Sequence, residues 1–372
     1  MIKPSITFLA YSDIHYHQYT NGITLADVEQ VENDALDLAI AHKVDFILFG
    51  GDRYVSRNPM YESAFASDRV LRRISNSGIP WLGLVGNHCR LTKNDFKAHS
   101  LSHVSLYKRD LAGITIMDQR TAYVIPVRDC SVAIHAVPAG HEPNNFTIAK
   151  DIDFHICMFH ALIMGSSFHN GTLVETGLSV SSFNERGFDL VLAGDNHKRQ
   201  QIKGLTDCQG YFLGAPMQHN WGDEGAERGY TIFTLDKAGL VGTPEFIPSR
   251  SPKFTRATWV VDDISKLALP AQHDTGTWEN NIIKLLISGP ADVLNSIDID
   301  TWKSKLINIS KARTIDIRLD YVAEDSPHDI YQSVPVTDAD EWKSYVAGRQ
   351  HELDQVDVEY LEKLGTKYIT ES

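Results

Sequence analysis

Five apolar, strand-like segments in the first 200 residues each lead into side chains that bind metal ions. Their ends carry aspartate, histidine and asparagine, which offer carboxylate, imidazole and amide ligands. Successive parallel strands present their carboxyl ends at one edge of a sheet, so these side chains are expected to converge. Two divalent cations held there could activate water and clamp a phosphate. The segments are Ile6–Tyr11, Phe46–Phe49, Trp81–Val85, Phe154–Phe159 and Leu190–Ala193, followed respectively by Asp13 and His15; Asp52; Asn87 and His88; His160; and Asp195 and His197.

A two-metal site needs one carboxylate shared by both ions, and Asp52 is the best candidate. It follows Gly50-Gly51, which lets the backbone turn tightly after a buried strand. Asp13 and His15 are two positions apart, so in an extended loop both would project from one side. Asn87 offers a neutral oxygen. Any one of these residues alone could instead cap a helix or close a turn, but five such strand ends together favour a metal site.

Histidines inside strands are interpreted differently from those at strand ends. His160 ends an apolar run and is expected to be a ligand. His155 lies within the same run, and His135 lies in the middle of another. Both are interpreted as core or edge histidines.

The elements that must position these residues alternate between strands and helices, which predicts an α/β fold. Helical spacing of apolar residues covers Asp27–His42 and Ser63–Ser75. From Ala112 onward the pattern changes to β-type segments, and a two-sheet core flanked by helices would accommodate both halves. The later strand candidates are Ile114–Met117, Ala122–Val127, Val132–Val137, Tyr211–Leu213 and Gly229–Leu235.

A composition break at Ile247–Pro252, rich in proline and serine, predicts a linker. Beyond it the pattern predicts a small β-α-β unit followed by a tail with two amphipathic helices. The expected divisions are residues 1–250, 254–325 and 326–372. The unit would contain strands Asn281–Ile287 and Thr314–Tyr321 and a helical region Ala291–Ile307, and Ala257–Val261 could pair alongside. The tail would contain helices Asp340–Gln350 and Val356–Leu364.

Composition restricts the class of protein. With 42% hydrophobic and 22% charged residues among 372, the chain is typical of a soluble globular protein. No apolar stretch approaches the roughly 20 residues that span a bilayer, so no membrane association is expected. Four widely spaced cysteines without a Cys-x-x-Cys pair argue against a disulfide framework or a thiolate zinc site. A reducing cytoplasm is therefore expected.

The net charge of −13 argues against a general nucleic-acid binder, but the charge is unevenly distributed. Residues 53–110 contain ten Lys/Arg against four Asp/Glu, a net of +6. Residues 338–372 contain nine acidic against four basic residues, a net of −5. The basic segment could contact phosphates or form a solvated helix face, and the sequence leaves both open.

The order and spacing of five motifs resemble those of the calcineurin-like metallophosphoesterases. The motifs are Asp-x-His, Gly-Asp, Gly-Asn-His, a lone His after a strand and a final Gly-x-x-His. Tyr211–Pro216 followed by Glu224–Tyr230 narrows the resemblance to the SbcD-like nuclease subunit of double-strand-break repair complexes, including its phage recombination counterparts. The resemblance covers residues 1–250. By position, the β-α-β unit is similar to the capping domain of that family.

The resemblance implies ligands for two cations, Mn²⁺ by preference with Mg²⁺ possible. His88 would not ligate but would face the scissile phosphate and either stabilise its charge or protonate the leaving oxygen. A metal-bound water would attack phosphorus in line. One ion would be held by Asp13, His15, Asp52 and His197, and the other by Asp52, Asn87, His160 and Asp195.

Three positions depart from the usual pattern of that family. Asp195 stands where histidine is usual, so three aspartates against two dications would leave the site near +1 rather than +2. This favours hard ions such as Mn²⁺ or Mg²⁺; alternatively, Asp195 only caps a turn and the second ion binds weakly. Cys89 replaces an aspartate and Arg53 replaces an apolar residue, which puts the support of the site in question.

The leading hypothesis is a DNA nuclease: a 3′ to 5′ duplex exonuclease and single-strand endonuclease. The tail would dock on an SbcC-like coiled-coil ABC-type ATPase, unless its helices pack back on the body, and the nuclease subunit would form a homodimer. The alternatives are a standalone phosphodiesterase or phosphatase with the same site, and a non-catalytic architectural subunit. The residues expected to contact DNA phosphates are Arg53, Arg57, Arg90 and Lys93.

Overall fold

The computed structural model describes residues 5–89, 111–143, 146–261 and 278–322. The chain divides into two compact units. The described part of the first unit comprises residues 5–218 and 226–252, apart from the gaps just given, and that of the second comprises residues 219–225, 253–261 and 278–322. No helix in these ranges has the length and apolar character needed to cross a membrane.

The first sheet has seven strands within the described residues, in the order β12-β11-β1-β2-β3-β4, with β13 also pairing with β11. Strands β1 to β4 are parallel to one another, and β11 is antiparallel to β1. The carboxyl ends of β1, β2 and β3 therefore meet at one edge. The strands are β1 (Ser5–Tyr11), β2 (Phe46–Phe49), β3 (Trp81–Leu84), β4 (Ile114–Met117), β11 (Gly229–Asp236), β12 (Gly239–Leu240) and β13 (Glu245–Pro248).

The second sheet has six strands in the described ranges, in the order β5-β6-β7-β8-β10-β9. Strands β6, β7, β8 and β10 are parallel, and β5 and β9 are antiparallel to their neighbours. The strands are β5 (Ala122–Val127), β6 (Cys130–Val137), β7 (Phe154–His160), β8 (Leu190–Gly194), β9 (Gln200–Gln201) and β10 (Gln209–Phe212).

The inner faces of the two sheets form one core. Phe8 stacks on Phe46 with 4.9 Å between ring centroids and on Phe233 with 5.4 Å. Ile156 and Leu192 of the second sheet join the same buried cluster. Each such side chain contributes about 1.5–3 kcal/mol when it leaves water. The predicted two-sheet core is confirmed.

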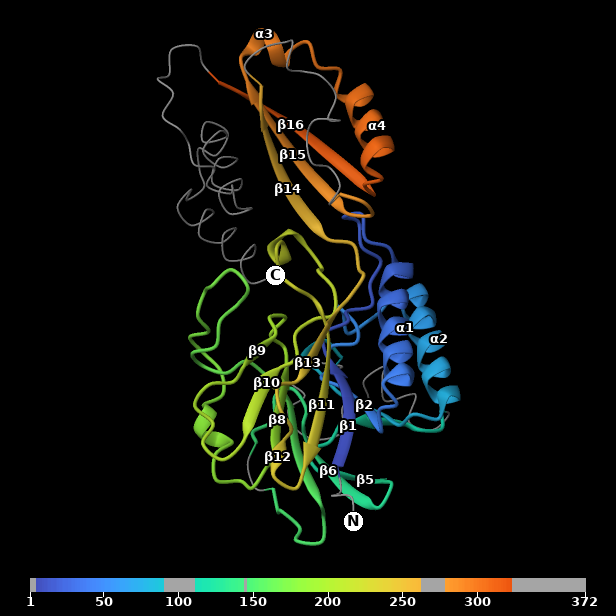
Figure 1. Cartoon of the computed structure of the whole chain (residues 1–372), viewed down its shortest axis with the longest axis vertical. Coiled ribbons are helices and arrows are strands. Elements are labelled where there is room, and N and C mark those ends of the chain that lie inside the picture. The colour runs from blue at the N-terminus through green and yellow to red at the C-terminus, as the bar shows by residue number, and fades with distance from the viewer. Residues whose placement is uncertain (1–4, 90–110, 144–145, 262–277, 323–372) are drawn as a thin grey trace. The chain divides into compact units, whose positions relative to one another are not determined.

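Two helices lie side by side next to the first sheet, α1 (Leu25–Ala41) and α2 (Tyr61–Ser77) (Figure 1). Thr24 caps the start of helix α1, and its backbone N–H donates to Asp27 Oδ2 at 2.7 Å in a capping box. Helix α2 ends at Gly78, where a φ of 77° suits glycine. Both predicted helices are confirmed, and each begins two residues earlier than expected.

The prediction that helices flank the core holds only for the first sheet. Within the described residues, the outer face of the second sheet is covered by the chain between β7 and β8, which forms turns and the 3₁₀ helix η3 (Val180–Ser182). Phe183 and Phe188 from this segment pack on Phe159 and its neighbours. Four glycines with positive φ interrupt the segment and prevent a long helix: Gly165, Gly171, Gly177 and Gly187.

The second unit contains a three-stranded parallel sheet, β14-β15-β16, with two short helices. Trp259 stacks on Trp278 in its core, with 5.8 Å between ring centroids. The predicted strands and helical region are confirmed, whereas the predicted tail helices lie outside the described residues. The elements are β14 (Phe254–Val260), β15 (Ile282–Gly289), β16 (Thr314–Tyr321), α3 (Ala291–Leu294) and α4 (Ile299–Ser310).

The segment predicted as a linker, Ile247–Pro252, begins as a strand. Ile247 and Pro248 belong to β13, which pairs antiparallel with β11. Strand β13 pairs only with β11 within the described residues, and such an edge strand tolerates a proline at its end. The two units divide after Pro252.

Candidate metal centre

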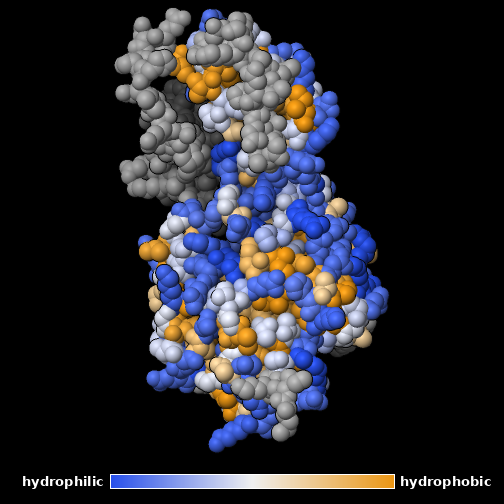
Figure 2. Space-filling view, viewed as in Figure 1, coloured by the Kyte–Doolittle hydropathy of each residue, from blue (hydrophilic) through white to orange (hydrophobic). Residues whose placement is uncertain are grey.

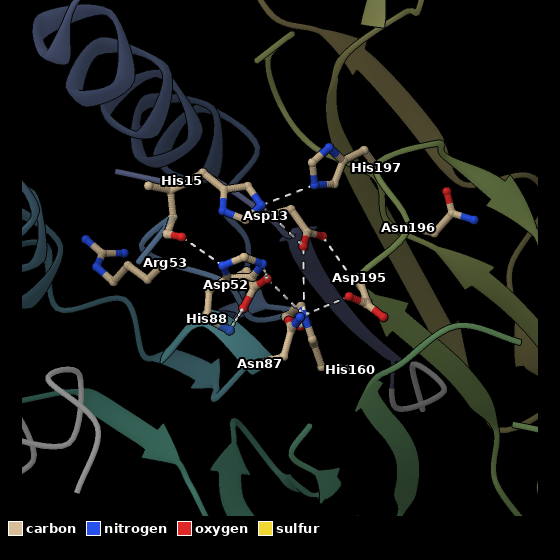
Figure 3. A network of polar contacts seen from close by, with 12 residues as sticks. Asp13, His15, Asp52, Arg53, Asn87, His88, His160, Asp195, Asn196 and His197 are labelled. Carbon is tan, nitrogen blue, oxygen red and sulfur yellow. Dashed lines mark hydrogen bonds and ion pairs between the residues drawn. The ribbon is translucent and has the colours of Figure 1, made fainter. Parts of the chain in front are cut away.

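The ends of five parallel strands bring the metal-binding side chains of the first unit together. Strands β1, β2 and β3 of the first sheet and β7 and β8 of the second lead into loops that meet at one edge (Figures 1 and 3). In Figure 3 the side chains from the two sheets approach one another across this edge. The residues brought together are Asp13, His15, Asp52, Asn87, His88, His160, Asp195 and His197.

Two triads of metal-binding atoms overlap at one residue. One triad is Asp13, His15 and Asp52, and the other is Asp52, His160 and Asp195. Within each triad the ligand atoms all lie within 4.8 Å of one another. Because Asp52 belongs to both, its carboxylate occupies the position that a two-metal site requires of a bridge.

The imidazole of His160 is held so that one nitrogen faces the carboxylates. Its Nδ1 lies 2.7 Å from the carbonyl oxygen of Gly50, which can accept the Nδ1–H. Its Nε2 then faces Asp52 Oδ2 at 3.3 Å, Asp195 Oδ1 at 3.7 Å and Asp13 Oδ1 at 3.9 Å. A backbone carbonyl that fixes the tautomer in this way is typical of a histidine ligand.

The amide of Asn87 lies against the shared carboxylate. Its Oδ1 is 3.0 Å from His160 Nε2. In the reversed orientation the amide nitrogen donates to Asp52 Oδ2 at 2.8 Å and Oδ1 at 3.2 Å. With the oxygen inward it lies against the acceptor oxygens of Asp52, an arrangement that a cation would stabilise. The donor set, all oxygen and nitrogen, therefore fits a hard divalent cation.

The remaining two ligand candidates complete the group on the side of Asp13. His15 Nε2 lies 3.1 Å from His197 Nε2. The backbone N–H of Asp195 donates to Asp13 Oδ2 at 3.2 Å, so the loop after β8 contacts the loop after β1. The cluster thus contains ligand candidates from both sheets on each side of Asp52.

The loops that carry the cluster have an unusual backbone. Asp13, His15, Asp52 and Asp195 have φ values of 54°, 51°, 55° and 76°. The left-handed region costs about 1–2 kcal/mol for a residue with a side chain, and such residues are concentrated at functional sites. The prediction that Asp13 and His15 project from an extended loop is therefore wrong, because a turn at both residues directs their side chains inward.

Backbone hydrogen bonds hold these loops together beyond the ends of their strands. Asp13 N donates to Gly51 O at 2.9 Å and His15 N to Asp52 O at 3.2 Å. A Cβ on Gly51, whose φ is 114°, would lie 2.3 Å from His160 Nδ1, and one on Gly86 would lie 2.1 Å from Asp52 Oδ1. Glycine at both positions therefore makes room for the side chains of His160 and Asp52.

The cluster concentrates negative charge. Burial alone would lower the pKa of His160, but Asp52, Asp13 and Asp195 outweigh it and raise that pKa to about 10. Burial raises the pKa of Asp13 to about 7, with Asp52 adding to the effect. Burial also raises the pKa of Asp195.

Asp52 behaves differently from the other two carboxyls. Burial would raise its pKa, but His160, His15 and His88 oppose this and hold the pKa at about 2. The shared carboxylate is therefore ionised throughout the physiological range. It supplies a permanent negative charge at the centre of the cluster.

His88 lies at the margin of the cluster. Its backbone N–H donates to Asp52 Oδ1 at 2.9 Å, and its Nδ1 lies 2.8 Å from the carbonyl oxygen of Val55. Its Nε2 is 3.8 Å from Asp52 Oδ2, and 43% of its side chain is exposed. The ring is thus fixed at one nitrogen and accessible to a substrate at the other.

The prediction that Arg53 contacts DNA is wrong, since its side chain is fully buried and paired with Glu32. A charged group that is excluded from solvent cannot reach a phosphate backbone. Arg57 is half-buried, and its predicted contact with DNA stays a prediction. Arg90 and Lys93 lie outside the described residues.

The other basic residues of this segment that lie on α2 form ion pairs on the helix surface. Arg72 pairs with Asp68 at 2.7 Å, and Arg69 pairs with Glu29 of α1. This favours the solvated helix face over a phosphate-binding surface for these residues.

Sequence reasoning missed the role of Glu32. It lies on the apolar face of α1, between Val28 and Leu36, and is fully buried. An acid at helical spacing within an apolar stripe signals a buried partner, and this signal could have been recognised.

Residues 6–199, more than half of the chain, match the calcineurin-like phosphoesterase family. The chain is 25% identical over 258 residues to the DNA double-strand break repair protein Mre11 of Methanosarcina acetivorans, a match that covers 68% of this chain and 40% of that protein. The Mre11 of Methanosarcina mazei is 27% identical with the same coverage, and that of Haloferax volcanii is 28% identical over 53% of this chain and 41% of that protein. The chain thus spans about 40% of the length of these relatives.

Solved structures give more distant matches. A dimetal phosphatase from Danio rerio has a TM-score of 0.40 and 12% identity, covering 65% of this chain and 98% of that one. TT1561 of Thermus thermophilus has a TM-score of 0.39 and 15% identity, covering 66% and 99%. The residues that match the family model include the loops after β1, β2, β3, β7 and β8, which carry the clustered aspartates and histidines. This chain therefore belongs to the calcineurin-like phosphoesterase family.

Proposed function

We propose that this chain is a metal-dependent DNA nuclease whose site holds two divalent cations. The observation that carries the proposal is the carboxylate of Asp52, which is common to two triads of metal-binding atoms. The similarity to proteins named DNA double-strand break repair protein Mre11 favours DNA as the substrate.

The proposed ligands fall into two sets around that carboxylate. When bound, such ions supply a nucleophilic water and neutralise charge on the phosphate. Oxygen and nitrogen donors without thiolates favour Mn²⁺, with Mg²⁺ as the alternative. The first set is Asp13, His15, Asp52 and His197, and the second is Asp52, Asn87, His160 and Asp195.

His88 is the proposed catalytic residue. Its Nδ1 is fixed on the carbonyl of Val55, so in the imidazolium form Nε2 carries a proton toward the exposed side. That proton can stabilise the charge of the scissile phosphate or pass to the leaving oxygen. Asp52 holds the backbone N–H of the same residue and keeps the ring next to the cluster.

The proposed activity is 3′ to 5′ degradation of duplex DNA and cleavage of single strands. It would be carried out together with an SbcC-like ATPase that the acidic tail would contact.

A homodimer is supported by exposed apolar side chains near the start of α2. Met60, Tyr61 and Phe65 are 51%, 82% and 63% exposed, and such a cluster is typical of an interface. The face shown in Figure 2 carries hydrophilic residues interspersed with apolar areas.

A cytoplasmic location is proposed for the same protein. All four cysteines are free, and Cys89 and Cys157 are buried. Free thiols persist in a reducing compartment.

The proposal is tested with end-labelled duplex DNA and a small phosphodiester, each with Mn²⁺. The parent should cleave both, and His88→Ala should slow both by about 10²- to 10⁴-fold, the usual contribution of a general acid. His42→Ala is the matched control, because His42 is an exposed histidine at the end of α1, and this variant should retain full activity.

Two results would contradict the nuclease assignment. Cleavage of the small ester without cleavage of DNA would indicate a standalone phosphodiesterase. Binding of DNA without cleavage of either substrate would indicate an architectural subunit.

A further inference from the structure

A buried ion pair lies directly behind the proposed bridging residue. Arg53 NH1 donates to Glu32 Oε1 at 2.7 Å, and NH2 donates to Oε2 at 2.9 Å. Neither side chain is exposed. The hydroxyls of Tyr11 and Tyr16 donate to the same two carboxylate oxygens at 2.6 and 2.7 Å. Both oxygens of Glu32 are thus bound twice.

The guanidinium is also fixed on its remaining sides. Its Nε donates to Ser67 Oγ at 2.5 Å, and NH2 also donates to Ser67 O at 3.1 Å. Its carbon lies 5.1 Å from the ring centroid of Tyr16 and 5.6 Å from that of Trp81. Helices α1 and α2 and strand β3 therefore all hold one side chain, which leaves it no second position.

Such a pair is a poor way to stabilise a core. Desolvation of two charges offsets most of their attraction, and apolar replacements of similar volume are often neutral or stabilising. A buried polar network is better suited to fixing one arrangement of the chain. Because the pair is neutral overall, it does this without adding positive charge near a cation site.

The arrangement that it fixes includes Asp52, the residue before Arg53, with its left-handed φ of 55°. On the backbone, Tyr16 N donates to Arg53 O at 2.7 Å, and Arg53 N donates to Cys89 Sγ at 3.3 Å. Tyr16 also binds Glu32, so the same ion pair holds the loops after β1 and β2. In Figure 3 the guanidinium of Arg53 points away from the carboxylate cluster.

We propose that Glu32 and Arg53 are positioning residues that hold the Asp52 carboxylate where both metal ions can share it. The inference rests on the proposed two-metal function. It adds that Glu32 and Arg53 determine how tightly the site binds its metal ions. The inference also connects Arg53 and Cys89, two of the positions that depart from the usual pattern of the family. The backbone N–H of Arg53 donates to Cys89 Sγ next to Asp52.

The test compares Mn²⁺ binding by the parent and by Glu32→Gln/Arg53→Met. The double variant removes both charges and leaves an amide for the tyrosine hydroxyls, so it should fold. Calorimetric titration should show at least a tenfold loss of affinity for one of the two ions. Electron paramagnetic resonance at two equivalents of Mn²⁺ should show the spin-coupled signal of a bridged pair in the parent and an uncoupled signal in the variant.

Val70→Ala is the matched control. Val70 is a buried residue of α2, and its truncation lowers the melting temperature without touching the ion pair. This variant should keep the coupled signal and both affinities. A loss of stability alone would therefore not imitate the predicted effect. Arg53→Lys, which retains the charge but not the bidentate fork, should fall between parent and double variant.

A folded double variant with the isotherm and coupled signal of the parent would overturn the inference and leave the two-metal proposal intact. If the double variant does not fold, Arg53→Lys decides: weaker binding of one ion supports the inference, and unchanged binding overturns it. A parent protein without any coupled signal would overturn the two-metal proposal itself, and the inference with it.

Discussion

Two histidines of the same strand, β7, have opposite surroundings. His160 ends the strand among three carboxylates, which raise its pKa to about 10 against the effect of burial. His155 lies five positions earlier, and its Nδ1 is 2.9 Å from Nε2 of His135 on the neighbouring strand. Burial, together with His155, lowers the pKa of His135 to about 4.

The difference shows that burial alone does not decide what a histidine does. Both His160 and His135 are almost completely buried. His135 packs against the rings of Phe146 and Phe188 in the middle of its sheet. His160 lies where parallel strands end and loops supply carboxylates. The surroundings of His135 therefore disfavour the charged imidazolium, whereas the carboxylates around His160 favour positive charge.

The largest expected effect on metal binding and activity comes from a change of the shared carboxylate, Asp52, beside His160. Asp52→Asn should abolish the binding of two ions and lower phosphodiesterase activity by at least about 10³-fold, because both triads lose a charge. Asp195→Asn touches only one triad and should retain binding of one ion. Titration with Mn²⁺ measures both stoichiometries. Parent-like activity of Asp52→Asn would remove Asp52 from the bridging role.

A smaller effect on Mn²⁺ affinity is expected from a change of pH. Without metal, His160 keeps its proton up to a pKa of about 10 and Asp13 up to about 7. A bound cation must displace these protons, so Mn²⁺ affinity should rise with pH between 6 and 8, by at most about tenfold per unit for each proton released. Calorimetry in two buffers of different ionisation enthalpy measures that release. A heat of binding that is independent of the buffer would contradict it.

The smallest effect is expected around His135, where pH changes the stability of the fold. The folded pKa of His135 lies below the usual 6.5, so below pH 6.5 the unfolded chain binds more protons and stability is lost down to about pH 4. The loss is at most about 3 kcal/mol. His135→Leu should flatten the dependence of the melting temperature on pH over this range and leave Mn²⁺ binding unchanged. A variant with the same slope as the parent would contradict the assignment.

The sequence was sufficient for the strands that lead into the cluster and for the convergence of their ends, but not for the short strands β9, β12 and β13. Apolar runs such as Phe154–Phe159 mark buried strands, and parallel order places the following residues at one edge. Periodicity could not reveal the left-handed turns at Asp13 and His15, since they depend on backbone contacts with the neighbouring loop.

Arg53 was mispredicted for a related reason. Its position in a basic segment suggested solvent, whereas its environment is decided by Glu32, 21 residues earlier on α1. Charge patterns along the chain do not identify partners that only folding brings together. The expectation that helices flank the whole core was wrong for the second sheet, because glycines with positive φ break the chain between β7 and β8 into turns.

The central claim is that two ions share the carboxylate of Asp52, and anomalous scattering from crystals soaked in Mn²⁺ tests it most directly. Two manganese peaks about 3.5–4 Å apart are expected, both in contact with Asp52, one also with His15 and the other with His160. A single peak, or two peaks that Asp52 does not join, would contradict the account.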